Sequence, residues 1–141
     1  MDPGSNLATL EAAYRRWGES KGGSVDEVLD LFADHIEMRS VLTADVPHEI
    51  SGTHSSKDEA RTYFEGLLKD WEMLSFEAER FIEGVGGEDI VMVGRCAWRH
   101  RTTRAEVATP KVDIWRFENG KAVLFYELFD TLAFARGVGL A

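Results

Sequence analysis

The spacing of apolar residues changes near Trp71, and this change constrains the fold more than any other feature. Before Trp71, apart from a short alternating stretch at 35–42, apolar side chains recur every three or four residues, which is typical of amphipathic helices. After it, they alternate with polar residues to about residue 130, as in strands with one buried face. Helices followed by strands predict an α+β fold in which helices cover one face of a curved antiparallel sheet.

Three helices are expected in the first half. The first apolar stripe covers residues 6–20. Ser24 with Glu27, and Ser56 with Glu59, have capping-box spacing and predict the starts of a short second helix and a long third helix. Between these two helices, the alternation predicts a strand at 35–42, followed by a polar loop at 43–55.

Four strands are expected in the second half, at 74–83, 89–101, 107–118 and 121–130. A last helical turn at 131–138 would be capped by Asp130. Because long strands twist and curl, the concave face can leave a cavity where the helices do not fill it. We expect residues 1–141 to form one domain, with about residues 1–5 disordered or a cloning remnant.

Composition excludes several classes of partner. The net charge of −9 disfavours binding to nucleic acid and to anionic membrane surfaces. Cys96 is the only cysteine, which excludes an intramolecular disulfide and fits a reducing compartment. No apolar run is long enough to span a bilayer, so we expect a cytoplasmic protein.

Several short motifs carry a resemblance to a known superfamily. They are Tyr14 in the first helix, Phe32-Ala33-Asp34, Ser51-Gly52-Thr53, the run DIWRFENGK at 113–121, and Phe129-Asp130-Thr131. In this order they resemble the nuclear transport factor 2-like superfamily, in its ketosteroid isomerase and SnoaL-like polyketide cyclase branch. The resemblance implies a cone-shaped sheet wrapped around three helices, with a small apolar ligand between them and no cofactor. It also implies a homodimer through the outer sheet face, which the apolar Leu124, Tyr126 and Leu128 would suit.

The resemblance also suggests catalytic roles. In the isomerase, a tyrosine and a protonated aspartate donate hydrogen bonds to the substrate oxygen while a second aspartate moves the proton. Tyr14 and Asp113 match the two donors. The alternatives are that Tyr14 is an ordinary core residue and that Asp113 pairs with an arginine such as Arg95. The proton-moving aspartate falls at Ser40, which cannot serve as a base, so ketosteroid isomerisation itself is not expected.

Glu127 and His100 are the main candidates to replace the missing base, with Asp45, His48 and Asp130 as further ones. Asn119-Gly120 signals a hairpin. A two-residue turn would put Asp113 opposite Tyr126. A type I turn with Gly120 as a bulge is the preferred geometry; it would put Asp113 opposite Phe125 and turn Glu127 inward.

Each of the other candidates also has a structural interpretation. His100 would face inward as a base or hydrogen-bond donor, although a strand-end histidine near solvent is favoured. Asp130 resembles in position the base of limonene epoxide hydrolase, but the Arg-x-Asp pair of that enzyme is missing, so a helix cap is favoured. The histidines are too scattered to predict a metal site.

Two functions follow. The first is a cofactor-free isomerase, cyclase or dehydratase that transfers a proton on a small apolar carbonyl or hydroxyl compound, with Asp113 and Tyr14 holding the substrate oxygen and Glu127 or His100 moving the proton. The second is a non-catalytic ligand-binding or dimerisation module. Polar side chains that converge inside the cavity would favour the first. The residues expected to bind the substrate are Trp17, Phe64, Trp71, Trp98, Trp115, Phe125, Phe129, Ser40 and Asp130.

Overall fold

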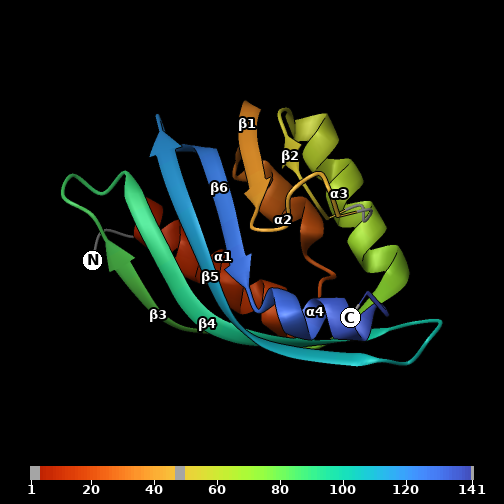
Figure 1. The fold of residues 1–141 in the computed structure, drawn as a ribbon. Coiled ribbons are helices and arrows are strands. Elements are labelled where there is room, and N and C mark those ends of the chain that lie inside the picture. Colours follow the sequence, from red (N-terminus) through yellow and green to blue (C-terminus); the bar gives the residue numbers. More distant parts are fainter. Residues whose placement is uncertain (1–3, 47–49, 141) are drawn as a thin grey trace.

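A computed structural model describes residues 4–46 and 50–140 (Figure 1). Within these residues, six strands form one sheet in the order β2-β1-β6-β5-β4-β3, accompanied by four helices. The predicted α+β class and curved sheet are confirmed. The elements are α1 (Asn6–Glu19), α2 (Val25–Asp30), β1 (Phe32–Ser40), β2 (Thr53–His54), α3 (Lys57–Asp70), β3 (Trp71–Glu83), β4 (Asp89–His100), β5 (Glu106–Glu118), β6 (Lys121–Phe129) and α4 (Thr131–Gly137).

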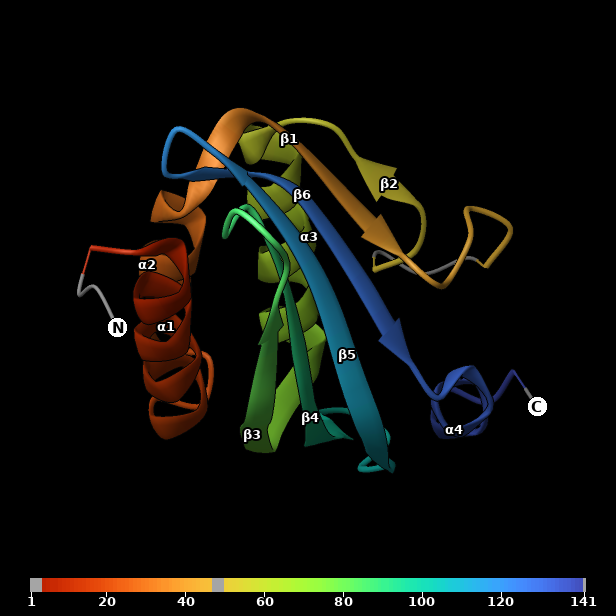
Figure 2. The same ribbon diagram turned by 90° about the vertical axis from the view of Figure 1, so that its left-hand side faces the viewer.

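The sheet bends strongly around α1 and α3, which bury their apolar stripes against it (Figure 2). Helix α1 packs on β3, and α3 contacts β1 and β3. The ring of Trp17 from α1 meets Phe64 from α3 edge-on at 5.7 Å between centroids. The core therefore lies between these helices and the concave face of the sheet.

Two features of the sheet differ from prediction. Strand β1 runs parallel to β6, whereas the other paired strands are antiparallel. It begins at Phe32 rather than 35, because the Ala122 N–H donates to the Leu31 carbonyl and the pairing of β1 with β6 starts there. The short strand β2 lies inside the segment predicted as loop, where Thr53 and His54 pair with β1.

One of the two predicted capping boxes is present. The Ser56 hydroxyl accepts a hydrogen bond from the Glu59 N–H at 3.1 Å, as predicted for the start of α3. The box predicted at Ser24 is wrong, because the backbone there is not extended and its hydroxyl accepts no hydrogen bond from α2. Ser5 caps α1 by accepting from the Ala8 N–H.

The β5–β6 hairpin closes with a two-residue turn instead of the predicted type I turn with a Gly120 bulge. Asn119 and Gly120 both have positive φ, 50° and 78°, as a type I′ turn requires. The irregularity comes later, where the partner of Arg116 is Leu124 and that of the next residue is Ala122. The predicted register is therefore wrong: Asp113 lies opposite Glu127, not Phe125.

Candidate functional site

The inner face of β5 carries three polar side chains where the alternation of the strand leads one to expect apolar ones. Thr109, Lys111 and Asp113 are buried, and their β5 neighbours at the intervening positions are more exposed. Asp113 is 2% exposed and Lys111 8% exposed. Glu127, 4% exposed, is brought opposite Asp113 by the register of the hairpin. The alternation of β5 and its register with β6 therefore place three charged side chains, Lys111, Asp113 and Glu127, together on the concave face.

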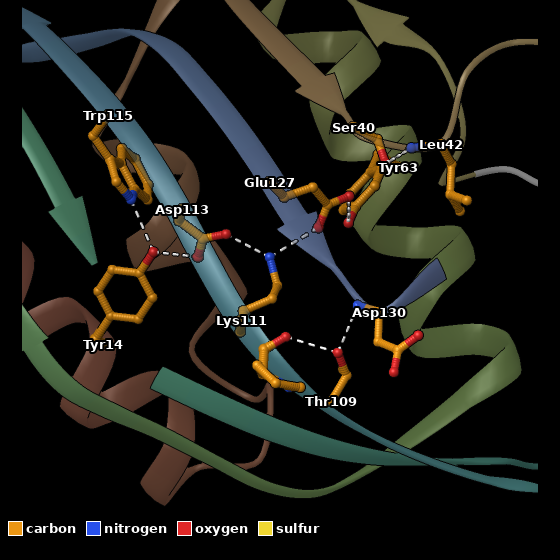
Figure 3. A network of polar contacts seen from close by, with 11 residues as sticks. Tyr14, Ser40, Leu42, Tyr63, Thr109, Lys111, Asp113, Trp115, Glu127 and Asp130 are labelled. Carbon is orange, nitrogen blue, oxygen red and sulfur yellow. Dashed lines mark hydrogen bonds and ion pairs between the residues drawn. The ribbon is translucent and has the colours of Figure 1, made fainter. Parts of the chain in front are cut away.

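The Lys111 ammonium lies between the two carboxylates (Figure 3). Its Nζ donates to Oδ1 of Asp113, and to Oε1 of Glu127 at 3.1 Å. All three groups are almost completely withdrawn from water. Buried charges persist when they are paired and hydrogen-bonded, and each carboxylate here meets this condition through the same ammonium.

Two tyrosines from the helices occupy the remaining carboxylate oxygens. The Tyr14 hydroxyl on α1 donates to Oδ2 of Asp113 at 2.5 Å and accepts from the Trp115 indole N–H at 2.8 Å. The Tyr63 hydroxyl on α3 donates to Oε2 of Glu127 at 2.7 Å. A continuous chain of hydrogen bonds thus links α1 to α3 across the concave face (Figure 3).

The surroundings fix the charge states of the lysine and the tyrosines. Burial alone would lower the pKa of Lys111, but the charges of Asp113 and Glu127 outweigh it and raise that pKa above its usual value. Burial and then the neighbouring carboxylate charges raise the pKa of Tyr14 and of Tyr63 well above the usual range. At neutral pH, Lys111 is therefore an ammonium and both tyrosines are neutral hydrogen-bond donors.

This cluster forms part of the wall of a cavity of about 110 Å³. A cavity of about 150 Å³ in another protein holds benzene, so the space here is of the order needed for one ring. The Trp71 indole N–H is buried and, among the described residues, has no hydrogen-bond partner. All seven aromatic residues expected to bind substrate line the cavity: Trp17, Phe64, Trp71, Trp98, Trp115, Phe125 and Phe129.

Three other candidates lie elsewhere. Ser40 is not in the cavity wall, and its hydroxyl accepts from the Leu42 N–H at 3.1 Å. Asp130 caps α4 by accepting from the Ala133 N–H at 3.0 Å, which confirms its predicted capping role and places it, too, outside the cavity wall. His100 is outside this wall as well: its Nδ1 accepts from the N–H groups of Thr102 and Thr103 at the end of β4.

The remaining candidates are placed as follows. Asp113 pairs with Lys111, whereas the alternative partner Arg95 pairs with Glu79 at 3.4 Å. Asp45 is outside the cavity wall and exposed, and His48 lies outside the described residues. The predicted pair of donors, Tyr14 and Asp113, does meet, but Tyr14 donates to Asp113 itself.

Sequence reasoning missed Lys111 and Tyr63 as site residues. The available signal for Lys111 was its position two residues before Asp113 on the buried side of a strand. Tyr63 lies on the apolar stripe of α3 and looks like an ordinary core residue. Only the pairing of β5 with β6 shows that both belong to one cluster.

The described residues contain no group of three or more histidine, cysteine, aspartate or glutamate side chains placed to hold a metal ion. Among the same residues, no helix has the length and apolar character needed to cross a membrane.

The bent sheet around helices is the fold of the nuclear transport factor 2-like superfamily. The chain belongs to the SnoaL-like domain family, whose profile it matches over residues 10–125. Comparison with curated proteins gives no significant match.

Solved structures of this superfamily resemble the chain over nearly its whole length. An NTF2-like protein of unknown function from Burkholderia pseudomallei has 26% identity and a TM-score of 0.79, over 93% of this chain and 95% of that one. An NTF2-like protein from Burkholderia thailandensis has 24% identity and a TM-score of 0.76, over 95% and 97%. TerC, co-crystallised with polyporic acid, has 18% identity and a TM-score of 0.78, over 95% and 98%.

Proposed function

We propose that this protein binds a small, largely apolar compound bearing a carbonyl or hydroxyl group and transfers a proton on it without a cofactor, as an isomerase, cyclase or dehydratase. The observation that carries the proposal is the Lys111 ammonium held between two buried carboxylates in the wall of an apolar cavity. Proton-transfer sites need titratable groups that converge where water is scarce, and this cluster meets that need.

Lys111 takes the role of holding the substrate oxygen. Two of its three N–H groups donate to Asp113 and Glu127; among the described residues the third meets no oxygen, and the ammonium lies 5.6 Å from the centre of the Phe125 ring. A positive donor at a substrate carbonyl stabilises the negative charge that develops on the oxygen during enolisation. Because its pKa is raised, Lys111 stays protonated and does not act as a Schiff-base nucleophile.

Glu127 is the group that we assign to move the proton. One of its carboxylate oxygens would accept a proton from the carbon next to the substrate carbonyl; the electron pair of the broken C–H bond would form the enolate, whose oxygen lies at Lys111. The same carboxyl would then return the proton to carbon at another position. Tyr63 holds the Glu127 carboxylate in place through its 2.7 Å hydrogen bond.

A non-catalytic ligand-binding module is the second candidate. It is favoured by Ser40 at the position expected for the base, and by the occupation of all four carboxylate oxygens of Asp113 and Glu127 by donors. The co-crystal of TerC with polyporic acid supports small-molecule binding within this fold under either candidate. Polyporic acid is therefore one of the compounds to test for binding.

Deuterium exchange separates the two candidates without knowledge of the natural substrate. The protein is incubated in D2O with 2-indanone, a compact ketone with acidic protons next to the carbonyl, and deuteration is followed by NMR. We expect catalysed exchange that falls at least tenfold in Glu127→Gln and stays unchanged in Glu118→Gln, an exposed glutamate at the end of β5. Exchange no faster than in buffer, with 2-indanone bound, would favour the binding module.

We further propose a cytoplasmic homodimer. The single cysteine, Cys96, is a free thiol, in keeping with a reducing compartment. The outer face of the sheet carries two cross-strand rows of partly exposed side chains that would suit a dimer interface: Val93, Val112 and Leu128, and Val91, Ile114 and Tyr126.

A further inference from the structure

The buried cluster has an unequal number of opposite charges. Lys111 is its one cation, and it is bonded to two carboxylates, Asp113 and Glu127, so that the formal excess is one negative charge. The next neighbours, Tyr14 and Tyr63, are neutral donors and do not correct the imbalance. Other lining residues are mainly aromatic and aliphatic. Any ligand that enters the cavity therefore meets a negative field that little water screens.

The hydrogen bonds of the cluster limit what a ligand can offer. Each carboxylate oxygen already accepts one hydrogen bond, whereas the third N–H of Lys111 donates to no oxygen of the described residues. This N–H is available to donate to an acceptor on the ligand. A carbonyl or hydroxyl oxygen is such an acceptor and adds no charge. A carboxylate is also an acceptor, but it would bring a third negative group against one ammonium.

We infer that the cavity selects an uncharged ligand whose oxygen accepts the third N–H of Lys111, and that it rejects the carboxylate analogue of the same shape. A ligand ammonium is disfavoured for a different reason, because it would lie beside the Lys111 ammonium and compete with it for the same carboxylate oxygens. The inference rests on the proposed function, since it names the charge class of the ligand for that site.

Benzamide and benzoate test the inference, because they have nearly the same shape and each fills about one ring of space. Binding of each to the wild-type protein is measured by titration at pH 7, where benzoate is ionised, with ¹H–¹⁵N NMR shifts of the cavity residues. We expect benzamide to bind at least ten times more tightly than benzoate.

The charge count also predicts how variants change this preference. Glu127→Gln leaves one carboxylate against one ammonium, so it should raise the affinity for benzoate relative to that for benzamide at least tenfold. Asp113→Asn removes the other carboxylate and should act in the same direction, which keeps the test available if one variant does not fold. Glu118→Gln is the control and should change neither affinity.

The outcomes separate this inference from the proposed function. Equal binding of the two probes, tighter binding of benzoate, or no gain for benzoate in either folded variant would overturn the inference and leave the proposed ligand cavity standing. Tighter binding of benzylamine than of benzamide would overturn it as well. A wild-type protein that binds none of these probes, even at millimolar concentration, would contradict the cavity on which both proposals rest.

Discussion

Lys111 holds the buried cluster together, and its removal should be more damaging than that of an ordinary lysine. Lys111→Met leaves Asp113 and Glu127 as buried carboxylates without a counter-charge. Breaking a buried ion pair from one side costs about 3 to 5 kcal/mol of the free energy of unfolding. Urea denaturation measures this loss, and Lys69→Met, at an exposed position of α3, should change stability little. Equal effects of the two substitutions would contradict a structural role for the cluster.

The buried Cys96 thiol should make the free energy of unfolding fall at alkaline pH. Burial raises its pKa to about 11 from a usual value of 9.0, so the folded state keeps the thiol proton at pH values where the unfolded chain loses it. The contribution of this thiol to the free energy of unfolding is complete below pH 9. About 2 to 3 kcal/mol of that free energy is lost as the pH rises from 9 to 11. The raised pKa of Lys111 acts in the same direction at higher pH.

Urea denaturation at pH 8, 9, 10 and 11 measures this transition. Cys96→Ala removes the thiol and should therefore show a smaller loss of stability between pH 9 and 11 than the wild type. For each protein, the loss is counted from its own stability at pH 8, because the smaller alanine side chain lowers the stability of the variant at every pH. Identical pH dependence of the two proteins would show that the thiol does not contribute.

At the scale of single residues, sequence reasoning found part of the cluster and missed its centre. Tyr14 and Asp113 are singled out by the resemblance, and Glu127 by the prediction that its side chain faces the covered side of the sheet. The structure brings all three together with Lys111. Lys111 was not identified because a buried lysine is rare, and its one local signal is that it lies two residues before Asp113 on the same face of a strand. Of its two partners, Asp113 lies on the same strand, whereas Glu127 lies on β6 and is brought near only by the β5–β6 register.

At the scale of elements, the close contact between α1 and β3 sets the position of Tyr14. A Cβ at Gly18 would lie 2.4 Å from the Phe76 carbonyl oxygen, which belongs to the backbone and cannot rotate away. Gly18→Ala should therefore push α1 from the sheet, cost about 1 to 3 kcal/mol by overpacking, and lengthen the hydrogen bond between Tyr14 and Asp113.

The exposed Glu19→Ala on the same helix is the control for Gly18 and should leave stability nearly unchanged. Denaturation measures the cost, and deuteration of 2-indanone reports whether the site is disturbed. A Gly18→Ala protein as stable as the wild type would show that the helix is free to shift.

Elements themselves were largely predictable, because their patterns are local. The four long strands, the start of α3 and the cap of α4 follow from alternation and from capping residues near each boundary. The prediction was wrong where two distant segments decide the structure. The parallel pairing of β1 with β6 and the shifted register after Arg116 depend on contacts across the sheet, and no local pattern encodes them.

At the scale of the whole molecule, the outer face of the sheet gives the last prediction. Ile114 lies between Val91 and Tyr126 in one apolar row, and a second row runs beside it. In a homodimer related by a two-fold axis, Ile114 would lie near the centre of the interface, and a charge there would be buried without a partner. Ile114→Glu should therefore convert the dimer to a monomer.

Light scattering after size exclusion measures the mass of both proteins at the same concentration. Val85→Glu is the control, since Val85 is fully exposed in the connection between β3 and β4 and lies outside both apolar rows. The inner cavity faces away from this surface, so the Ile114→Glu monomer should still bind benzamide. A wild-type protein that stays monomeric at 100 µM, a concentration about a hundred times above a micromolar dissociation constant, would refute the dimer and leave the apolar rows unexplained.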